Sequence, residues 1–260
     1  MNFLKKLAVK LRQKAALRGY TCDRCGKEVF DYPSKRLCED CETLLWKNTE
    51  AVCPKCGRKV LSQGVCLTCK SHMPKFTQGI SAFVYYGETA ALVNRFKNGE
   101  RILGFYFAEK MANALYTCLQ ACNANSEKKE NNANEPLLIL SVPTTKARLR
   151  ERGFNQAEDL AITVCKMLEK KGLSAIYGED VLIKQRETSM QKHMHREERA
   201  KNVDGAYRVQ KRSVCKNQCI VLIDDIMTTG ATGSECAERL FAAGAKEVYF
   251  LTAASLQESK

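Results

Sequence analysis

The chain has 260 residues, which is enough for one sizeable core domain and one small module. It carries 42 Lys and Arg against 29 Asp and Glu, a formal net charge of +13, so its surface favours polyanions such as nucleic acid, anionic lipid or phosphorylated ligands. A soluble enzyme that happens to be basic explains this charge equally well. No apolar run approaches about 20 residues, so we expect no transmembrane helix.

Residues 1–19 form the first predicted segment, a basic amphipathic helix. The first 18 residues hold six basic side chains and no acidic one, with Phe and Leu between them. No continuous apolar stretch or small-residue cleavage site follows, so the segment does not have the pattern of a signal peptide. It either contacts a membrane surface or DNA, or packs weakly against the next module, and we favour the second interpretation.

Residues 20–72 predict a double zinc ribbon. Eight of the 14 cysteines form four Cys-x-x-Cys pairs, whose two-residue gaps let both thiolates of a pair face one ion. These are Cys22, Cys25, Cys38, Cys41, Cys53, Cys56, Cys66 and Cys69. Two pairs complete a tetrahedral four-sulfur site, so we expect two structural zinc ions, with the pairs combined either sequentially or in an interleaved order. Disulfides would require an exported protein, and we see no export signal.

Residues 77–260 predict an α/β domain. Strands are expected at residues 79–86, 137–142, 181–184, 207–209, 220–223 and 247–252. Helices are expected at residues 88–98, 101–122, 155–171 and 234–244. Alternating strands and helices with short links favour a parallel sheet flanked by helices. Residues 123–135 hold five Asn and no large apolar residue, which predicts a disordered loop.

One polar segment follows the predicted strand at 137–142. Pro143 and Thr144 come first, and four basic side chains follow within seven residues: Lys146, Arg148, Arg150 and Arg152. Cations at the end of a parallel strand can neutralise a pyrophosphate or a nucleic-acid backbone. A solvated basic face is the alternative.

The most specific motif spans residues 220–232, IVLIDDIMTTGAT. Four apolar residues predict a buried strand, Asp224 and Asp225 follow at its carboxyl end, and a run of small and hydroxyl-bearing residues leads into a helix. Such a run lets backbone N–H groups and a helix N-terminus bind a phosphate, while the carboxylates accept hydrogen bonds from ribose hydroxyls. The chain has neither a G-x-x-x-x-G-K-[ST] loop nor a G-x-G-x-x-G after a strand, so the usual nucleotide-binding alternatives lack their motifs. The remaining alternative is a turn in which Thr229 or Thr232 caps the helix.

Residues 224–232 resemble the phosphoribosyl-pyrophosphate (PRPP) binding motif of type I phosphoribosyltransferases. The cysteine-rich module, Arg95-Phe96-Lys97 after the first strand, and the sequence RLRERGFNQ at 148–156 narrow the resemblance to the ComF (ComFC) competence family. That family combines a zinc module with a phosphoribosyltransferase-like domain, so the resemblance covers most of the chain.

The resemblance implies that PRPP binds together with Mg²⁺. Asp224 and Asp225 would be the catalytic pair that holds the ribose. The 5′-phosphate would be bound by Met227, Thr228, Thr229, Gly230, Ala231 and Thr232. The pyrophosphate, or another polyanion, would face Pro143, Thr144, Lys146, Arg148, Arg150 and Arg152. A flexible active-site loop would contain Arg186, Gln191, Arg196 and Arg199, with His193 and His195 as a general base or as ordinary loop residues.

Two functions follow from this resemblance. The first is a Mg²⁺-dependent phosphoribosyltransferase with an unknown acceptor, which handles incoming single-stranded DNA during natural transformation. It would act in the cytoplasm, at the inner face of the membrane, with a helicase-like competence partner. The second is a non-catalytic protein whose phosphate loop and basic surface bind nucleic acid while its zinc ribbons dock the partner.

Overall fold

The computed structural model describes residues 21–31, 35–49, 51–125, 135–186 and 203–258. The chain divides into two compact units, Met1–Leu45 and Trp46–Lys260. The division into a 20–72 module and a 77–260 domain remains a prediction. The helix expected within residues 1–19 and the central part of the loop expected at 123–135 lie outside the described residues.

The smaller unit is organised by its cysteines. An antiparallel bridge joins Thr21 to Glu28 around the first Cys-x-x-Cys pair, and helix α2 (Glu39–Thr43) begins directly after Cys38. The side chains of Arg36 and Asp23 form an ion pair at 3.3 Å in which both are largely buried. This ion pair joins the first knuckle to the residues directly before Cys38.

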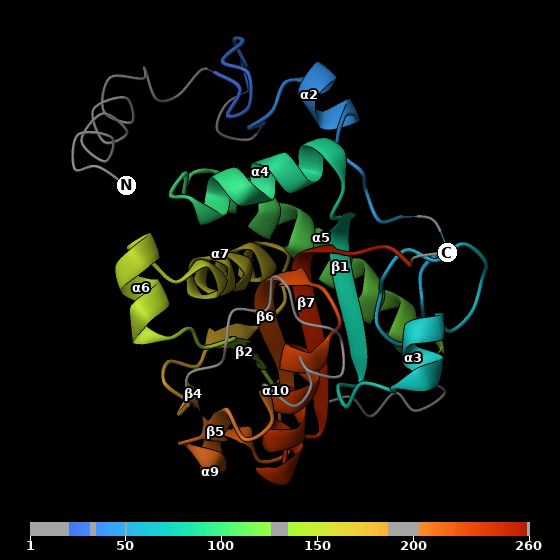
Figure 1. Cartoon of the computed structure of the whole chain (residues 1–260), viewed down its shortest axis with the longest axis vertical. Coiled ribbons are helices and arrows are strands. Elements are labelled where there is room, and N and C mark those ends of the chain that lie inside the picture. The colour runs from blue at the N-terminus through green and yellow to red at the C-terminus, as the bar shows by residue number, and fades with distance from the viewer. Residues whose placement is uncertain (1–20, 32–34, 50, 126–134, 187–202, 259–260) are drawn as a thin grey trace. The chain divides into compact units, whose positions relative to one another are not determined.

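The larger unit contains a five-stranded sheet with the order β1-β7-β6-β2-β3, and each neighbouring pair of strands is parallel (Figure 1). The strands are β1 (Gln78–Val84), β2 (Leu137–Ser141), β3 (Ala175–Tyr177), β6 (Cys219–Met227) and β7 (Glu247–Ser255). The central strands are apolar along most of their length because both of their faces are covered, as in other parallel sheets. The predicted α/β fold with a parallel sheet is confirmed.

Helices cover both faces of this sheet. Helices α5 (Leu103–Asn125) and α7 (Gln156–Lys170) pack against each other on one face, and α10 (Ala231–Ala242) lies on the opposite face (Figure 1). Right-handed crossovers explain this arrangement, since the chain moves outward from β2 to β3 and in the other direction from β6 to β7. The direction therefore reverses between β2 and β6, and in open α/β sheets such a switch point is where ligands bind.

Shorter helices complete the described ranges. They are α3 (Leu67–Ser71), α4 (Gly87–Lys97), α6 (Lys146–Arg152) and α9 (Arg212–Cys215). No helix within the described ranges combines the length and the apolar character needed to cross a bilayer.

Several parts of the α/β unit differ from the sequence-based expectation, and one of them is strand β3 (Ala175–Tyr177), which was not predicted. The strands expected at 181–184 and 207–209 are present as β4 (Leu182–Lys184) and β5 (Tyr207–Val209), but they pair antiparallel with each other in a separate sheet. Helix α6 was not predicted, because its sequence KARLRER has one large apolar residue and buries no side chain. The residues that start and stop this helix lie at its two ends. The Thr145 side chain accepts a hydrogen bond from the Arg148 N–H at the N-cap, and Gly153 adopts a φ of 80° at the C-cap.

The second half of the cysteine-rich region packs onto the sheet. The Gly79 N–H on β1 donates to the Lys55 carbonyl at 2.8 Å, and a Cβ on Gly79 would lie 2.4 Å from the Cys56 carbonyl oxygen. Phe76 is fully buried and its ring centroid lies 5.4 Å from that of Phe250 on β7. Cys53, Cys56, Cys66 and Cys69 therefore share one hydrophobic core with the sheet and α10.

We predict that Gly79→Ala destabilises the larger unit by about 1–3 kcal/mol, the usual cost of forcing a methyl group into a filled core. The contact is backbone against backbone, so no side-chain rotation relieves it. Chemical denaturation followed by tryptophan fluorescence measures the change, since the single Trp lies in this unit at position 46. Gln78→Ala on the same strand is the control, and equal stability of the two variants would contradict the close approach.

Candidate functional site

A cavity of about 650 Å³ opens at the carboxyl ends of β2 and β6, at the switch point of the sheet. Most of its lining comes from three parts of the chain: the β6–α10 connection, the segment after β2 that includes α6, and the last turns of α4. Its wall includes Asp224, Asp225 and all six residues expected to bind the 5′-phosphate, from Met227 to Thr232. The fold therefore brings the motif at 220–232 and the segment after β2 to one place.

The aspartate pair lies inside strand β6 rather than after it. The strand continues to Met227, and Ile226 and Met227 pair with Ala254 and Ser255 of β7. The expected strand at 220–223 is therefore too short, because the polar aspartates ended the apolar pattern but did not end the backbone pairing. The consequence is that the backbone of both aspartates is fixed by the sheet.

The phosphate-loop candidate ends in a helix N-terminus. Helix α10 begins at Ala231, three residues earlier than expected, with Gly230 as its N-cap at a φ of 82°. Gly230 has no side chain that could cap the helix. The hydroxyl of the preceding residue, Thr229, instead accepts a hydrogen bond from the Ala231 N–H at 3.3 Å. A left-handed residue at this position suits glycine, which has no Cβ to strain the backbone.

Burial and charge distinguish the two carboxylates. Desolvation, reinforced by the neighbouring Asp225 carboxylate, raises the pKa of Asp224 to about 7. The Asp225 N–H donates to Asp224 Oδ1 at 2.8 Å, which partly offsets this rise. Asp225 is 8% exposed and its Oδ2 lies 3.2 Å from Nζ of Lys97 on α4. The sequence placed Lys97 in a family motif but gave it no role at the site, and the fold brings it there.

Helix α6 separates the four cations that the sequence grouped together. Arg148 and Arg152 lie one turn apart, are half-buried and line the cavity. Lys146 and Arg150, on another face of the same helix, are exposed. Lys146 borders an adjacent cavity of about 480 Å³, whereas Arg150 is outside the lining of both cavities. Pro143 and Thr144 line both.

Two lining residues come from the small antiparallel sheet and were not predicted. Tyr207 on β5 is 4% exposed, and burial raises the pKa of its phenol, which remains a neutral hydrogen-bonding group. Nζ of Lys184 on β4 lies 5.4 Å from the centroid of the Tyr207 ring. Both segments looked like ordinary short strands, and only the pairing of β4 with β5 places them beside the cavity.

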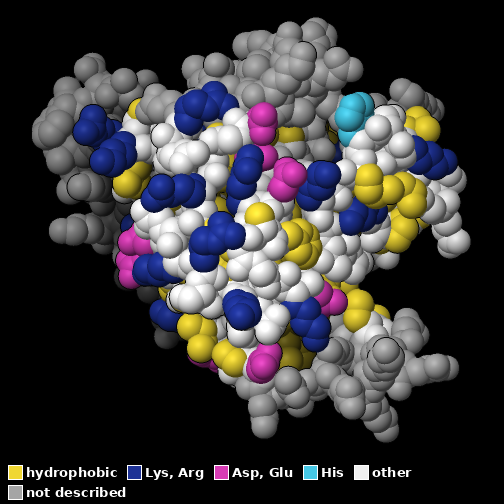
Figure 2. Space-filling view, turned by 90° about the horizontal axis from the view of Figure 1, so that it is seen from below, with side chains coloured by type: hydrophobic (Ala, Val, Ile, Leu, Met, Phe, Trp, Pro, Cys, Tyr) yellow, Lys and Arg dark blue, Asp and Glu magenta, His cyan; other side chains and the backbone are white. Residues whose placement is uncertain are grey.

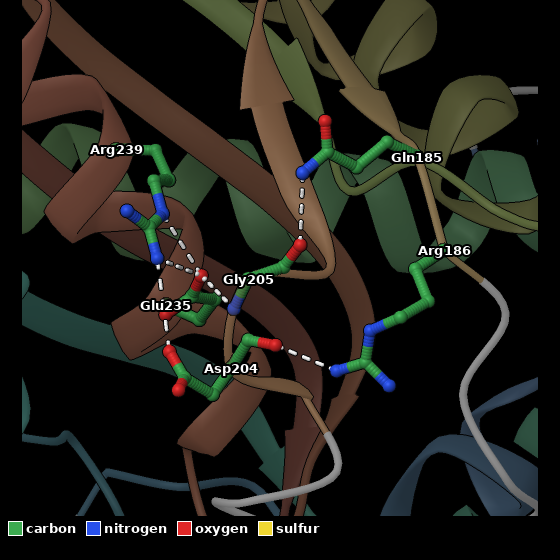
Figure 3. Close-up of polar contacts among 6 residues, drawn as sticks. All are labelled: Gln185, Arg186, Asp204, Gly205, Glu235 and Arg239. Carbon is green, nitrogen blue, oxygen red and sulfur yellow. Dashed lines mark hydrogen bonds and ion pairs between the residues drawn. The ribbon is translucent and has the colours of Figure 1, made fainter.

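The residues that flank positions 187–202 on either side are held together by hydrogen bonds (Figure 3). Arg186 Nη2 donates to the Asp204 carbonyl at 2.6 Å, and Gln185 Nε2 donates to the Gly205 carbonyl at 3.0 Å. Of the four residues expected in a flexible loop, Arg186 is thus placed at this stem. The other three, and the two histidines expected beside them, lie outside the described residues: Gln191, Arg196, Arg199, His193 and His195.

Helix α10 anchors this stem. The Gly205 N–H donates to Oε1 of Glu235, a 6% exposed residue on α10, at 2.9 Å (Figure 3). Arg239, one turn further along the helix, donates through Nε to the same carboxylate oxygen at 2.9 Å. The helix whose N-terminus faces the cavity therefore also fixes the base of the segment that follows β4.

The two cysteine clusters resolve the pairing that the spacing left open. Cys22, Cys25, Cys38 and Cys41 converge in the smaller unit, and Cys53, Cys56, Cys66 and Cys69 converge in the larger one. Within each cluster, the sulfur atoms all lie within 4.8 Å of one another. The pairing is sequential, as in the simpler of the two predicted arrangements.

The sulfur geometry fits a tetrahedral ion. Sγ atoms of Cys25 and Cys38 are 3.7 Å apart, as are those of Cys56 and Cys66. Four sulfurs at about 2.3 Å from zinc form a tetrahedron with edges of about 3.8 Å. Backbone N–H groups of Cys66 and Cys69 donate to Sγ of Cys53 and Cys66 at 3.4 Å, which stabilises thiolates. Four sulfur ligands leave no open coordination position, so either cluster could hold a structural zinc ion.

Comparisons with known proteins give consistent sequence relatives. The chain is 24% identical over 213 residues to the DNA utilization protein YhgH of Escherichia coli K12, covering 82% of this chain and 87% of that protein. It is 24% identical over 217 residues to competence protein F of Haemophilus influenzae, with the same two coverages. It is 25% identical over 206 residues to competence protein ComFC of Bacillus subtilis, covering 77% of this chain and 75% of that protein. The resemblance to the ComF family is thereby confirmed.

No protein-family model matches the chain. Among solved structures, an allosteric regulatory enzyme of purine biosynthesis aligns with a TM-score of 0.33 and 18% identity, over 58% of this chain and 25% of that one. A hypoxanthine-guanine phosphoribosyltransferase from Schistosoma mansoni, in complex with IMP, aligns with a TM-score of 0.30 and 16% identity, over 58% of this chain and 54% of that one.

We predict that Asp224→Asn changes the pH dependence of stability. The folded protein keeps Asp224 protonated up to about pH 7, whereas in the unfolded chain it ionises near its ordinary value of 3.8. The unfolded state therefore gains from ionisation, and the free energy of unfolding falls as the pH rises from about 4 to 7. Asn does not ionise, so the Asp224→Asn variant does not lose this stability. The free energy of unfolding of the variant, relative to that of the wild type, should therefore increase by at least about 1 kcal/mol between pH 4 and pH 8.

Denaturant titrations at the two pH values measure this change. Thr144→Val is the control, because it alters the same cavity without removing a titrating group. A constant difference between Asp224→Asn and the wild type across this range would show that the carboxylate is not desolvated.

We also predict about two zinc ions per chain by atomic absorption, one for each four-sulfur cluster. Cys25→Ser and Cys56→Ser should each remove one ion. Only Cys56→Ser should also lower the stability of the larger unit, because its cluster lies in that core. A metal-free wild-type protein would exclude the zinc assignment.

Proposed function

We propose that this chain is a ComF-type phosphoribosyltransferase that binds PRPP with Mg²⁺ in the cavity between β2 and β6. One observation carries the proposal: a helix N-terminus, an aspartate pair and two arginines from separate parts of the chain line one cavity of about 650 Å³ at the switch point. Each of these groups suits a different part of PRPP.

The 5′-phosphate and the pyrophosphate are assigned to different parts of the cavity lining. Backbone N–H groups and hydroxyls between Met227 and Thr232 suit the 5′-phosphate, because the partial positive charge of the α10 N-terminus favours an anion there. Arg148 and Arg152, with Pro143 and Thr144, suit the pyrophosphate. Between them, Asp224 and Asp225 can accept hydrogen bonds from the ribose hydroxyls.

The reaction would form a bond from a nitrogen nucleophile to the anomeric carbon and break the bond from that carbon to pyrophosphate. Charge neutralisation and positioning of the two reactants lower the barrier of such a step. The Asp224 and Asp225 carboxylates stabilise positive charge that develops on the ribose, and the two arginines hold the departing pyrophosphate. Bound Mg²⁺ would neutralise charge on the pyrophosphate oxygens.

Calorimetry with PRPP and Mg²⁺ tests the binding step. We predict that the wild type binds and that Asp224→Ala and Asp225→Ala each weaken the affinity at least tenfold, equivalent to about 1.4 kcal/mol. Arg150→Ala is the matched control, since this arginine is exposed and outside the cavity lining. Absence of PRPP binding in the wild type would refute the enzyme proposal.

A second candidate function is binding of single-stranded DNA, with or without catalysis. The relatives are named for competence and DNA utilization, and the chain carries a net charge of +13. On the face in Figure 2, Lys and Arg are dispersed among apolar and acidic side chains rather than gathered in one patch. Lys146 and Arg150 on α6 are exposed and are our candidates for phosphate contacts. A cytoplasmic location at the inner membrane face, with a helicase-like partner, belongs to this proposal.

Salt titrations of DNA affinity separate the two functions. Each phosphate contact on a single strand contributes about 0.7 to the slope of log affinity against log salt. Arg150→Ala should reduce that slope by about this amount and leave PRPP binding unchanged, whereas Arg148→Ala should weaken PRPP binding. A slope that Arg150→Ala does not alter would remove this residue from the DNA surface.

A further inference from the structure

We infer that Arg58 is a positioning residue that ties the second cysteine cluster to the phosphate loop, so that this cluster sets the affinity of the cavity for a sugar phosphate. The identity of the ligand rests on the proposed function. The contact between cluster and loop does not, since it is a feature of the protein alone.

Arg58 is 5% exposed and uses three nitrogens on three partners. Its Nε donates to Cys56 Sγ at 3.4 Å, and its Nη1 donates to Thr68 Oγ1 at 3.4 Å. Its Nη2 donates to the carbonyl oxygen of Thr228 at 2.9 Å. The first two contacts belong to the second cysteine cluster and to α3 within it, and the third belongs to the loop after β6.

The cluster explains why a guanidinium can be buried here. Burial of an unpaired charge is costly, and Arg stays protonated at any ordinary pH. Four thiolates around one zinc ion carry a net charge of about −2, which offsets the cation. Without the cluster, Arg58 would lose its counter-charge.

The Thr228 contact orients the next backbone donor. A trans peptide is planar, so its carbonyl and the following N–H point in opposite directions. Arg58 holds the Thr228 carbonyl, and this directs the Thr229 N–H away from the guanidinium. Thr229 lines the cavity, where backbone N–H groups are proposed to bind the 5′-phosphate. Arg58 therefore favours the loop conformation in which the Thr229 N–H points away from the cysteine cluster and does not bond to it.

Other contacts hold the cluster and α10 at a fixed separation. The Lys75 N–H donates to Ser234 Oγ in the first turn of α10 at 2.9 Å. A Cβ on Gly230 would lie 3.8 Å from the Phe76 ring, which is an ordinary packing distance. The Leu67 N–H donates to Oε1 of Glu258, beyond β7, at 2.7 Å. Because the separation is fixed, a change in the cluster reaches the loop through Arg58.

The effect should be confined to one side of the cavity. Arg148 and Arg152, the proposed pyrophosphate side, are on α6, which follows β2 rather than β6. Loss of the Arg58 contact should therefore weaken binding of ribose 5-phosphate but not of pyrophosphate. A general loss of stability would weaken both.

Calorimetry of the full chain with each ligand tests this difference. For Arg58→Gln we expect at least a tenfold loss of affinity for ribose 5-phosphate and less than a twofold change for pyrophosphate. Arg58→Lys, which has one nitrogen in place of three, should give an intermediate loss. Arg24→Gln is the matched control, because Arg24 makes the equivalent contact to Cys41 Sγ, at 3.4 Å, in the first cluster. Equal losses for both ligands, or none for ribose 5-phosphate, would overturn the inference.

Amide hydrogen exchange without ligand provides a second readout. Arg58→Gln, or removal of metal from the second cluster, should accelerate exchange at residues 228–231 relative to the wild type and to Arg24→Gln. Unchanged exchange at these residues would overturn the inference. If the wild type binds neither ligand, the proposed function fails, while this measurement still decides the role of Arg58.

Discussion

The parallel pairing of β2 with β6 is the constraint on which the rest of the structure depends. These strands are separated by about 80 residues in the chain, yet Leu138 to Ser141 pair in register with Ile220 to Ile223. The pairing places two connections side by side at the switch point, one with a helix N-terminus and one with arginines. Neither connection alone forms a cavity, and each is positioned by hydrogen bonds of a buried sheet.

Charge balance in the cavity follows from this arrangement. The carboxylates of β6 are desolvated by their neighbours, and the cations that offset them come from α4 and α6. Lys97 already contacts Asp225, so a ligand that approaches the aspartates meets an existing ion pair. A ligand that carries both hydroxyls and phosphates can satisfy both partners, whereas a simple anion or a simple cation satisfies only one.

The sequence predicted what depends on local pattern and on covalent spacing. Apolar runs identified four of the five strands of the main sheet, all except β3, and Cys-x-x-Cys spacing identified both clusters. It did not identify α6, which buries no side chain, or the extension of β6 past two aspartates, which depends on pairing with β7. Lys184, Tyr207 and Arg58 were missed for another reason: each is an ordinary residue in its own segment, and only contacts across the fold bring it to the site.

The close approach of Gly79 to Cys56 also bears on how the protein can be divided. A fragment that starts at residue 77 would expose the side of β1 on which the second knuckle rests, together with the pocket that Phe76 fills beside Phe250. Its sheet would have a bare apolar surface and a tendency to aggregate. A cut near residue 45 instead follows the boundary between the compact units and keeps this surface covered. The second cysteine cluster thus serves the sheet as a structural cap.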